Sequence, residues 1–254
     1  MLQSGWEHEA GWQAMLETLE RFAIPHSFHR VVPFVGELEP PPEPHSPEVI
    51  CFGSYSMRHY ATKMGWNPGV FDLASSDFVV QRQHWGDAML NADSEVVAFK
   101  DVAFTGERFI RPIEDTKAFT GAIFDSHKFA DWQRRVIDLG EDIGSSLTGA
   151  TLVQVSTPKS IHAEIRCWMI EGRAVTASAY KQGDRVFYSD VVDRRFTDYA
   201  EGLAAAWSPE KAFCLDVCDT DDGMRIVEIN TINSAGFYAA DMQKLVMALD
   251  DLRR

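Results

Sequence analysis

Apolar positions in the first third of the chain recur at two different spacings. Over 6–22 they follow helical spacing, which predicts an amphipathic helix. The expected buried stripe consists of Trp12, Met15, Leu16 and Leu19. A short apolar run over 49–53 predicts a buried strand, and residues 57–64 predict a helix that ends at Gly65. The first portion of the chain, 1–86, is therefore expected to be a small α/β domain.

The pattern changes near residue 87, and the second portion, 87–254, carries most of the predicted strands. Its expected elements, in chain order, are a helix over 85–91, extended segments over 95–100 and 108–113, a helix over 125–139, strands over 151–156, 161–170 and 173–181, a helix over 197–207, a hairpin over 213–230 and a helix over 239–252. We expect Asp125 or Ser126 to cap the long helix. The whole chain is expected to belong to the α+β class.

Composition indicates a folded protein and limits its partners. The chain has 254 residues, of which 45% are hydrophobic, and 7 Trp, 16 Phe and 6 Tyr are available for a core. Its formal charge of −14 argues against a nucleic-acid backbone as the main partner. Signal peptides, transit peptides and membrane-spanning runs are absent from the sequence, and the four cysteines lack zinc-site spacing. We expect a cytoplasmic protein with reduced, buried thiols and no membrane partner, and the oligomeric state stays open.

The segment over 213–230 predicts a hairpin with polar side chains on one face. Residues 221–223 mark its turn, and pairing centred on Asp222 places Asp216 opposite Glu228. Alternation then assigns the same face to Asp216, Glu228 and Asn230. The expected core face consists of Phe213, Leu215, Val217, Val227 and Ile229. Facing carboxylates repel unless a cation lies between them, and these oxygen ligands suit Mg²⁺. A solvated acidic face is the alternative interpretation.

A second hairpin is predicted over 161–181, with a turn at Glu171 and Gly172. Its expected register assigns one face to Glu164, Arg166, Trp168, Ala177, Ala179 and Lys181. Cations beside a carboxylate, flanked by small alanines, are typical of a surface with room for a ligand. An ordinary ion pair on the sheet is the alternative interpretation.

A third segment, FIRPIEDTKAFTG over 109–121, places Arg111 within an apolar run, where a guanidinium needs an anionic partner. Pro112 is expected to end the strand. The loop that follows offers side chains and backbone amides for phosphates, from Thr116, Lys117, Thr120 and Gly121. It is not a Walker A loop, and an ordinary surface loop is the alternative.

In this order the three segments resemble the ATP-grasp superfamily. RP with DTKAFTG, then AEIR, SAYK, LDV and VEIN, are similar in detail to the clade named for two arginines and one lysine, although the loop has fewer glycines than is usual there. The resemblance covers about 88–252. It implies an ATP-grasp fold of two α+β subdomains that clasp ATP over 87–254, with a hinge near 154–156, and a pre-ATP domain over 1–86.

The resemblance also implies roles for individual residues. The residues implied to bind the nucleotide are Arg111, Lys117, Thr120, Gln154, Val155, Glu164 and Lys181. The residues implied in catalysis are Arg111, Arg166 and Lys181. The residues implied to hold magnesium, expected as two ions, are Asp216, Glu228 and Asn230.

The activity that the resemblance implies is ATP- and Mg²⁺-dependent ligation of a carboxylate to an amine through an acyl phosphate. The substrate is expected to be a peptide, a protein or an amino acid. Two alternatives stay open, a kinase on the same fold and a nucleotide-binding interaction module without catalysis. The acceptor site is expected between the N-terminal portion and the ATP-grasp domain, where the candidates are Tyr55, Arg58, His59 and Trp66. Packing or surface positions are the alternative interpretation for these four residues.

Overall fold

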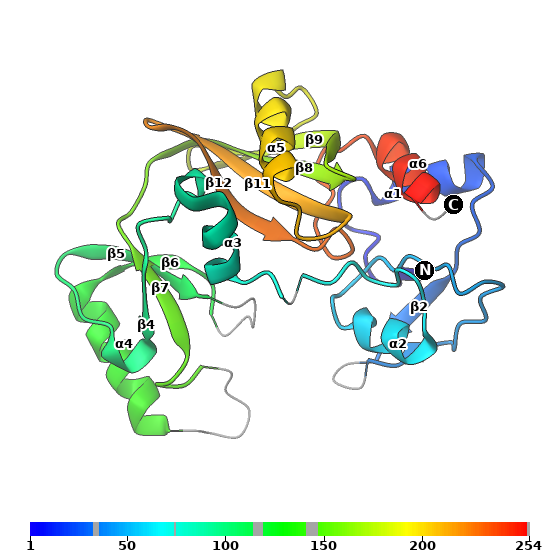
Figure 1. The fold of residues 1–254 in the computed structure, drawn as a ribbon. Coiled ribbons are helices and arrows are strands. Elements are labelled where there is room, and N and C mark those ends of the chain that lie inside the picture. The colour runs from blue at the N-terminus through cyan, green and yellow to red at the C-terminus, as the bar shows by residue number, and fades with distance from the viewer. Residues whose placement is uncertain (33–35, 74, 114–118, 141–146, 253–254) are drawn as a thin grey trace. The chain divides into compact units, whose positions relative to one another are not determined.

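The structure is a computed structural model that describes residues 1–32, 36–73, 75–113, 119–140 and 147–252. The chain divides into two compact units, unit 1 with Met1–Leu73 and Ile161–Arg254, and unit 2 with Ala74–Ser160. The N-terminal portion therefore belongs to the same unit as the two hairpins of the C-terminal half (Figure 1). The domain boundary that we expect between residues 86 and 87 stays a prediction.

Unit 1 contains a five-stranded antiparallel sheet with the strand order β10-β9-β8-β11-β12. Its strands are β8 (Ile161–Ile170), β9 (Arg173–Gln182), β10 (Arg185–Ser189), β11 (Ala212–Thr220) and β12 (Gly223–Asn230). Helix α5 (Arg194–Ala206) packs on β8, β9 and β11, and helix α6 (Met242–Leu252) packs on β8 and β9. The two predicted hairpins are confirmed, whereas β10 was not expected from the sequence.

The N-terminal part of unit 1 has a small sheet of β1 (Leu2–Gln3), β2 (Phe28–Val31) and β3 (Leu38–Glu39). Helix α1 (Trp12–Arg21) contacts α6, and both contribute to a core that includes Trp168 of the large sheet. Helix α2 (Met57–Met64) has the predicted bounds, and Gly65 ends it with φ 67°. The predicted strand over 49–53 is wrong, because that segment makes only isolated bridges.

Two differences from the expected helices have local causes. Helix α1 begins six residues later than expected, directly after Gly11, which has a left-handed backbone with φ 82°. The helix expected over 85–91 is wrong, since helix α3 (Phe78–Trp85) precedes it and only a short 3₁₀ turn, η1 (Gly86–Ala88), follows. Asp77 caps α3 by accepting a hydrogen bond from the N–H of Val80 at 2.9 Å.

Unit 2 contains a four-stranded sheet with the order β4-β7-β5-β6. Its elements are β4 (Glu95–Ala98), η2 (Phe99–Asp101), β5 (Glu107–Pro112), β6 (Ala122–Asp125), α4 (Ser126–Leu139) and β7 (Leu152–Ser156). Asp125 caps α4, as expected, by accepting from the N–H groups of His127 and Lys128. In its core, Trp132 packs edge to face against both Phe99 and Phe129.

Two expectations about the chain as a whole can be compared with the described residues. All four cysteines are free and buried, as expected. Among the described helices, none is long and apolar enough to span a bilayer.

Candidate functional site

The hairpin of β11 and β12 carries the central polar residues. Asp216 pairs with Glu228, as the sequence predicts. The next pair is Val217 with Ile226, so β12 carries an extra residue, Val227, at a bulge. The expected burial of Val227 is therefore wrong, and Ile226 is the fully buried residue. The turn pairs Thr220 with Gly223, so the hairpin is centred slightly earlier in the chain than the expected centre, Asp222. The bulge at Val227 offsets this difference, and Asp216 therefore still pairs with Glu228.

Asp216, Glu228 and Asn230 lie on one face of this hairpin and contact one another. The side-chain Nδ2 of Asn230 donates to Oε1 of Glu228 at 3.1 Å and to Oδ2 of Asp216 at 3.3 Å. Asp216 is 1% exposed, whereas Glu228 and Asn230 are half-buried. The amide thus stands between two carboxylates that would otherwise repel each other.

Arg166 of β8 lies opposite Asp216 of β11 and forms a two-pronged ion pair with it. Nε donates to Oδ1 at 2.8 Å, and Nη2 donates to Oδ2 at 2.7 Å. The rings of Tyr238 and Tyr180 lie 4.9 and 5.8 Å from the guanidinium carbon and stack on each other at 5.0 Å. The cation that facing carboxylates require is thus supplied on one side by Arg166, which is itself buried.

Burial sets the electrostatics of this ion pair. Desolvation raises the pKa of the Asp216 carboxyl to about 6, although the charge and hydrogen bonds of Arg166 act in the opposite direction, and the charges of Glu228 and Glu164 raise it further. Burial alone would lower the pKa of Arg166, but the neighbouring Asp216 outweighs it, and the pKa is raised. The carboxyl would therefore gain from an additional positive charge nearby.

Glu164 forms a second polar group on β8 and β9. Lys181 Nζ donates to its Oε1 and Tyr180 Oη to its Oε2, both at 2.8 Å. Glu164 is buried and pairs with Lys181 across the strands, whereas Lys181 is partly exposed. Lys181 thus holds its charge at the edge of the cluster, within reach of solvent.

The alanines expected beside these charges are on the other face. The β8–β9 register shifts twice, so Trp168 pairs with Thr176 and Arg166 with Ser178. The side chain of Ser178 is fully buried and accepts from the N–H of Ala239 at 3.1 Å. The predicted open space beside Ala177 and Ala179 is therefore wrong, and covered hydroxyls take its place.

The remaining predicted residues lie in unit 2. Arg111 is the fifth residue of β5 and pairs with Gln154 of β7, and Pro112 ends β5 as expected. Gln154 is buried, and its Oε1 accepts from Ser94 Oγ at 3.3 Å. A Cβ at Gly121 would lie 2.9 Å from Cβ of Arg111, so only glycine fits there.

Of the other residues predicted in unit 2, the structure describes Val155 and Thr120. Val155 is half-buried in β7, and Thr120 is exposed immediately before Gly121 and β6. Lys117 and Thr116 lie outside the described residues. Arg111, Gln154 and Val155 thus form one group on β5 and β7, separate in the chain from the group on β8, β9, β11 and β12.

Tyr180 and Tyr238 are site residues that sequence reasoning missed. Strict alternation places Tyr180 on the face opposite Lys181, and the register shift near Glu164 brings both to that one carboxylate. Tyr238 lies in an irregular segment with φ 50°. A tyrosine beside the SAYK lysine is the available signal for Tyr180, and no periodic pattern signals Tyr238.

The acceptor-site candidates have mixed surroundings. Trp66 is buried and packs on Tyr60 with ring centroids 5.4 Å apart, so its role is packing. The guanidinium of Arg58 stacks over the ring of Tyr55 at 3.9 Å, and the hydroxyl of Tyr55 donates to Asp72. His59 is exposed. These contacts leave Tyr55, Arg58 and His59 as candidates without a shown role.

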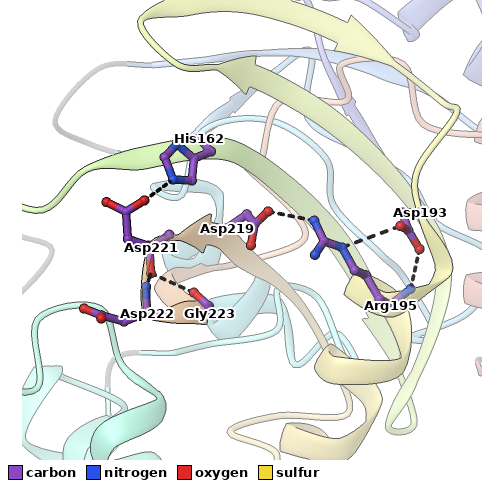
Figure 2. Close-up of polar contacts among 8 residues, drawn as sticks. His162, Asp193, Arg195, Asp219, Asp221, Asp222 and Gly223 are labelled. Atoms are coloured by element: carbon purple, nitrogen blue, oxygen red, sulfur yellow. Dashed lines mark hydrogen bonds and ion pairs between the residues drawn. The ribbon is translucent and has the colours of Figure 1, made fainter.

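Further acidic residues lie at the tip of the same hairpin (Figure 2). His162 Nε2 and Asp221 Oδ1 are 2.8 Å apart, and Arg195 Nη2 donates to Asp219 Oδ2 at 2.7 Å. The side chains of His162 and Asp221 are 53% and 77% exposed. These two contacts are separate from each other and lie at the surface, which fits the solvated acidic face considered above for the hairpin as a whole.

The donor chemistry at the base of the hairpin fits magnesium. Among the residues that the structure describes, no group of three His, Cys, Asp or Glu side chains could hold a metal. A set of two carboxylates and the Asn230 amide instead offers hard oxygen ligands, and Mg²⁺ commonly takes only one or two carboxylates with water and phosphate. Glu164, Asp216 and Glu228 bring three carboxylates to this cluster, where Arg166 pairs with Asp216 and Lys181 pairs with Glu164.

Comparisons with known proteins agree with this architecture. The model of an ATP-grasp domain family, the third in the clade named for two arginines and one lysine, matches residues 44–249. No curated protein matches the chain. The solved structures that are similar include ATP-grasp ligase PsnB with its minimal precursor, at a TM-score of 0.58 and 15% identity over 100% of this chain and 98% of that chain.

Two further structures have the same fold at low identity. The RimK domain protein ATP-grasp from Sphaerobacter thermophilus DSM 20745 has a TM-score of 0.63 and 14% identity over 98% of this chain and 95% of that chain. D-cycloserine synthetase DcsG has a TM-score of 0.63 and 12% identity over 100% and 99%. The expected α+β ATP-grasp fold is confirmed over the full chain.

Proposed function

Because the chain belongs to the third ATP-grasp family of the clade with two arginines and one lysine, we propose that it is an ATP- and Mg²⁺-dependent carboxylate–amine ligase. The observation that carries the proposal is the polar cluster of Asp216, Glu228 and Asn230 beside Arg166. The ion pair of Asp216 and Arg166 is buried, and Asn230 connects it to the half-buried carboxylate of Glu228. These charged groups are held close together and largely away from solvent, as is common at functional sites and unusual for a solvated surface.

In this proposal the residues divide into three tasks. Asp216, Glu228 and Asn230 hold two magnesium ions, which when bound neutralise charge on the phosphate oxygens. The positive charges for the triphosphate come from Arg111, Lys117, Arg166 and Lys181, with Thr120 in the loop over the phosphates and Glu164 orienting Lys181. The backbone of Gln154 and Val155 binds the adenine edge.

The proposed chemistry needs positioned charge more than covalent catalysis. The substrate carboxylate attacks the γ-phosphorus, which gives an acyl phosphate and ADP, and the amine then displaces inorganic phosphate. Negative charge spreads over the transferring phosphoryl group, so preorganised cations lower the barrier. Arg166 has five N–H donors, and three donate to Asp216 and to the carbonyl of Gly236, which leaves two for phosphate.

We propose a peptide as the substrate. PsnB, which shares the fold, has been solved with a precursor peptide, and another of its structures contains Mg and ADP. The charge of −14 on the present chain would attract a basic peptide and raise its encounter rate. An amino-acid or protein substrate is compatible with the same chemistry.

The experiment combines ATP, Mg²⁺ and pooled peptides with and without an amine, and measures ADP together with condensation products by mass spectrometry. ADP that forms only with both substrates supports the ligase, and hydroxylamine should trap the acyl phosphate. Phosphorylated product without a trapped hydroxamate indicates the kinase. Tight Mg²⁺·ATP binding without any turnover indicates the interaction module.

A matched pair of variants tests the site itself. Glu228→Gln should lower turnover by at least about 100-fold, because it replaces the charged carboxylate of a proposed metal ligand with a neutral amide. Asp222→Asn changes an exposed carboxylate at the tip of the same hairpin and should leave turnover unchanged. Equal activity of the two variants would remove Glu228 from the proposed site.

A further inference from the structure

The segment after β12 ties the candidate site to the N-terminal part of unit 1. Asn233, three residues after Asn230, is 2% exposed. Its Nδ2 donates to the carbonyl oxygen of Cys51 at 2.5 Å, and its Oδ1 accepts from the N–H of Phe71 at 2.8 Å. Its own carbonyl oxygen accepts from the N–H of Gly53 at 2.9 Å. Asn233 thus holds two backbone segments, 51–53 and 71, that are distant from it in sequence.

Thr231 extends the same link. Its hydroxyl lies 2.8 Å from the carbonyl oxygen of Phe71, to which it donates, and 3.1 Å from Oδ1 of Asn233. Buried backbone groups need such partners, and an amide offers a donor and an acceptor from one planar group. Aspartate at position 233 would lack the donor for Cys51, and leucine would lack both groups. The chemistry of asparagine therefore matches this position closely.

The link formed by Asn233 lies just beyond the end of β12, the strand that carries Glu228 and Asn230. Among the described strands, β12 lies at the edge of its sheet, so its ladder hydrogen bonds run to β11 alone within that part of the chain. Asn230 is its last residue and pairs with Cys214. The end of an edge strand that is held on one side opens readily, unless a second contact fixes it. Asn233 provides that contact immediately beyond Asn230.

We propose that Asn233 is a positioning residue for the magnesium ligands Glu228 and Asn230. By fixing the end of β12 to residues 51–53 and 71, it holds both side chains in the arrangement that the metal requires. The N-terminal portion then contributes to the metal site without supplying a ligand. This inference rests on the proposed function, since it needs magnesium at that hairpin.

The test compares ADP binding by titration calorimetry in Mg²⁺ and in EDTA, with the full chain. Mg²⁺ should tighten ADP binding to the unmodified protein by at least about 10-fold. Asn233→Ala should lose about 10-fold of this gain, the loss typical when a metal ligand's supporting contact is removed. Its affinity for ADP in EDTA should stay unchanged. A role in folding alone would alter both affinities together or neither.

Two controls separate the link from general packing. Val70→Ala removes packing from the neighbouring N-terminal core but keeps every hydrogen bond of Asn233, and it should retain the Mg²⁺-dependent gain. Thr231→Val removes one hydroxyl of the link and Thr231→Ser keeps it, so only the valine variant should lose part of the gain. If Asn233→Ala does not fold, the comparison of Thr231→Val with Thr231→Ser tests the positioning role instead.

The possible failures are distinguishable. If the unmodified protein shows no Mg²⁺-dependent gain, the proposed magnesium site is wrong. If it shows the gain, and Asn233→Ala and Thr231→Val retain it in full, the positioning role is wrong while the magnesium site stands. Val70→Ala losing the gain as strongly as Asn233→Ala would also overturn the positioning role.

Discussion

The base and the tip of the β11–β12 hairpin carry the same kinds of charged residues in opposite surroundings. At the base, Asp216 is 1% exposed and receives two hydrogen bonds from Arg166. At the tip, Asp221 is 77% exposed and contacts the largely exposed His162 (Figure 2). The partner differs, a guanidinium at the base and an imidazole at the tip, and burial differs strongly as well. The buried contact is therefore the one that we expect to affect stability and chemistry.

The physical reason is the cost of an uncompensated charge. Solvent screens the pair at the tip, where either residue alone would be hydrated, and such pairs contribute about 0–1 kcal/mol. The pair at the base has lost its water, so each partner depends on the other. The same dependence holds Arg166 and Asp216 in a defined geometry, as a preorganised site requires.

The largest expected effect is on Asp216. Asp216→Ala leaves Arg166 buried without its partner and should lower the free energy of unfolding by about 3–5 kcal/mol. Urea unfolding followed by tryptophan fluorescence measures this. The control, Asp221→Ala at the tip, should change it by less than about 0.5 kcal/mol. Similar losses for both variants would contradict the contrast between base and tip.

The next effect concerns Cys218, a fully buried thiol on the same face of β11 as Asp216. Burial raises the pKa of Cys218 from 9.0 to about 12, so the thiolate, which is the reactive form, becomes abundant only as the pH approaches that value. At pH 8 its alkylation by iodoacetamide should be about 1000-fold slower in the folded protein than in urea. Mass spectrometry of the Cys218 peptide gives both rates. Rapid alkylation of folded protein would show that Cys218 is open to solvent on the face that carries Asp216.

A smaller effect should follow when both partners at the base are replaced. Arg166→Met with Asp216→Leu removes the charges together, and a buried ion pair exchanged for apolar side chains of similar volume is often tolerated. The double variant should be at least about 1 kcal/mol more stable than Asp216→Ala in the same urea experiment. A double variant that is less stable than the single one would show that the cluster depends on these polar groups for more than charge balance.

The smallest effect distinguishes a partly buried ion pair from an exposed one. Lys181→Met should cost about 1 kcal/mol, because it leaves the buried Glu164 with Tyr180 as its remaining hydrogen-bond donor. Lys63→Met removes an ion pair with Glu37 in which both side chains are exposed, and it should cost nothing measurable. Equal values in urea unfolding would place Lys181 with the surface pairs.

Sequence periodicity predicts the hairpins well because each is a local structure. Ile170 pairs with Arg173 as the turn and the alternation predict. Asp216 pairs with Glu228 as predicted because the bulge at Val227 offsets a turn that is centred slightly earlier than expected. Each bulge adds one residue to a strand, and this changes the hydrophobic pattern too little for the bulge to be recognised from the sequence. Alternation alone therefore assigns Val227 to the core.

Contacts between distant segments could not be predicted in this way. Arg166 and Asp216 are 50 residues apart, and their contact depends on β8 pairing with β11 after β9, β10 and α5 have intervened. The link from Asn233 to Phe71 and Cys51 spans more than 160 residues. Such pairings follow from how hydrophobic faces are buried together, which local spacing does not specify.

The choice of asparagine at position 230 matters for more than the hydrogen bonds that this side chain forms. An amide has a donating end and an accepting end, and half a turn of its terminal bond exchanges them. With its nitrogen inward it keeps Asp216 and Glu228 from repelling, and with its oxygen inward it becomes a ligand in the proposed site. Aspartate could act only in the second way, and three anions would then face one another whenever the ion departed. With asparagine at position 230, the hairpin can stay folded both without magnesium and with magnesium bound.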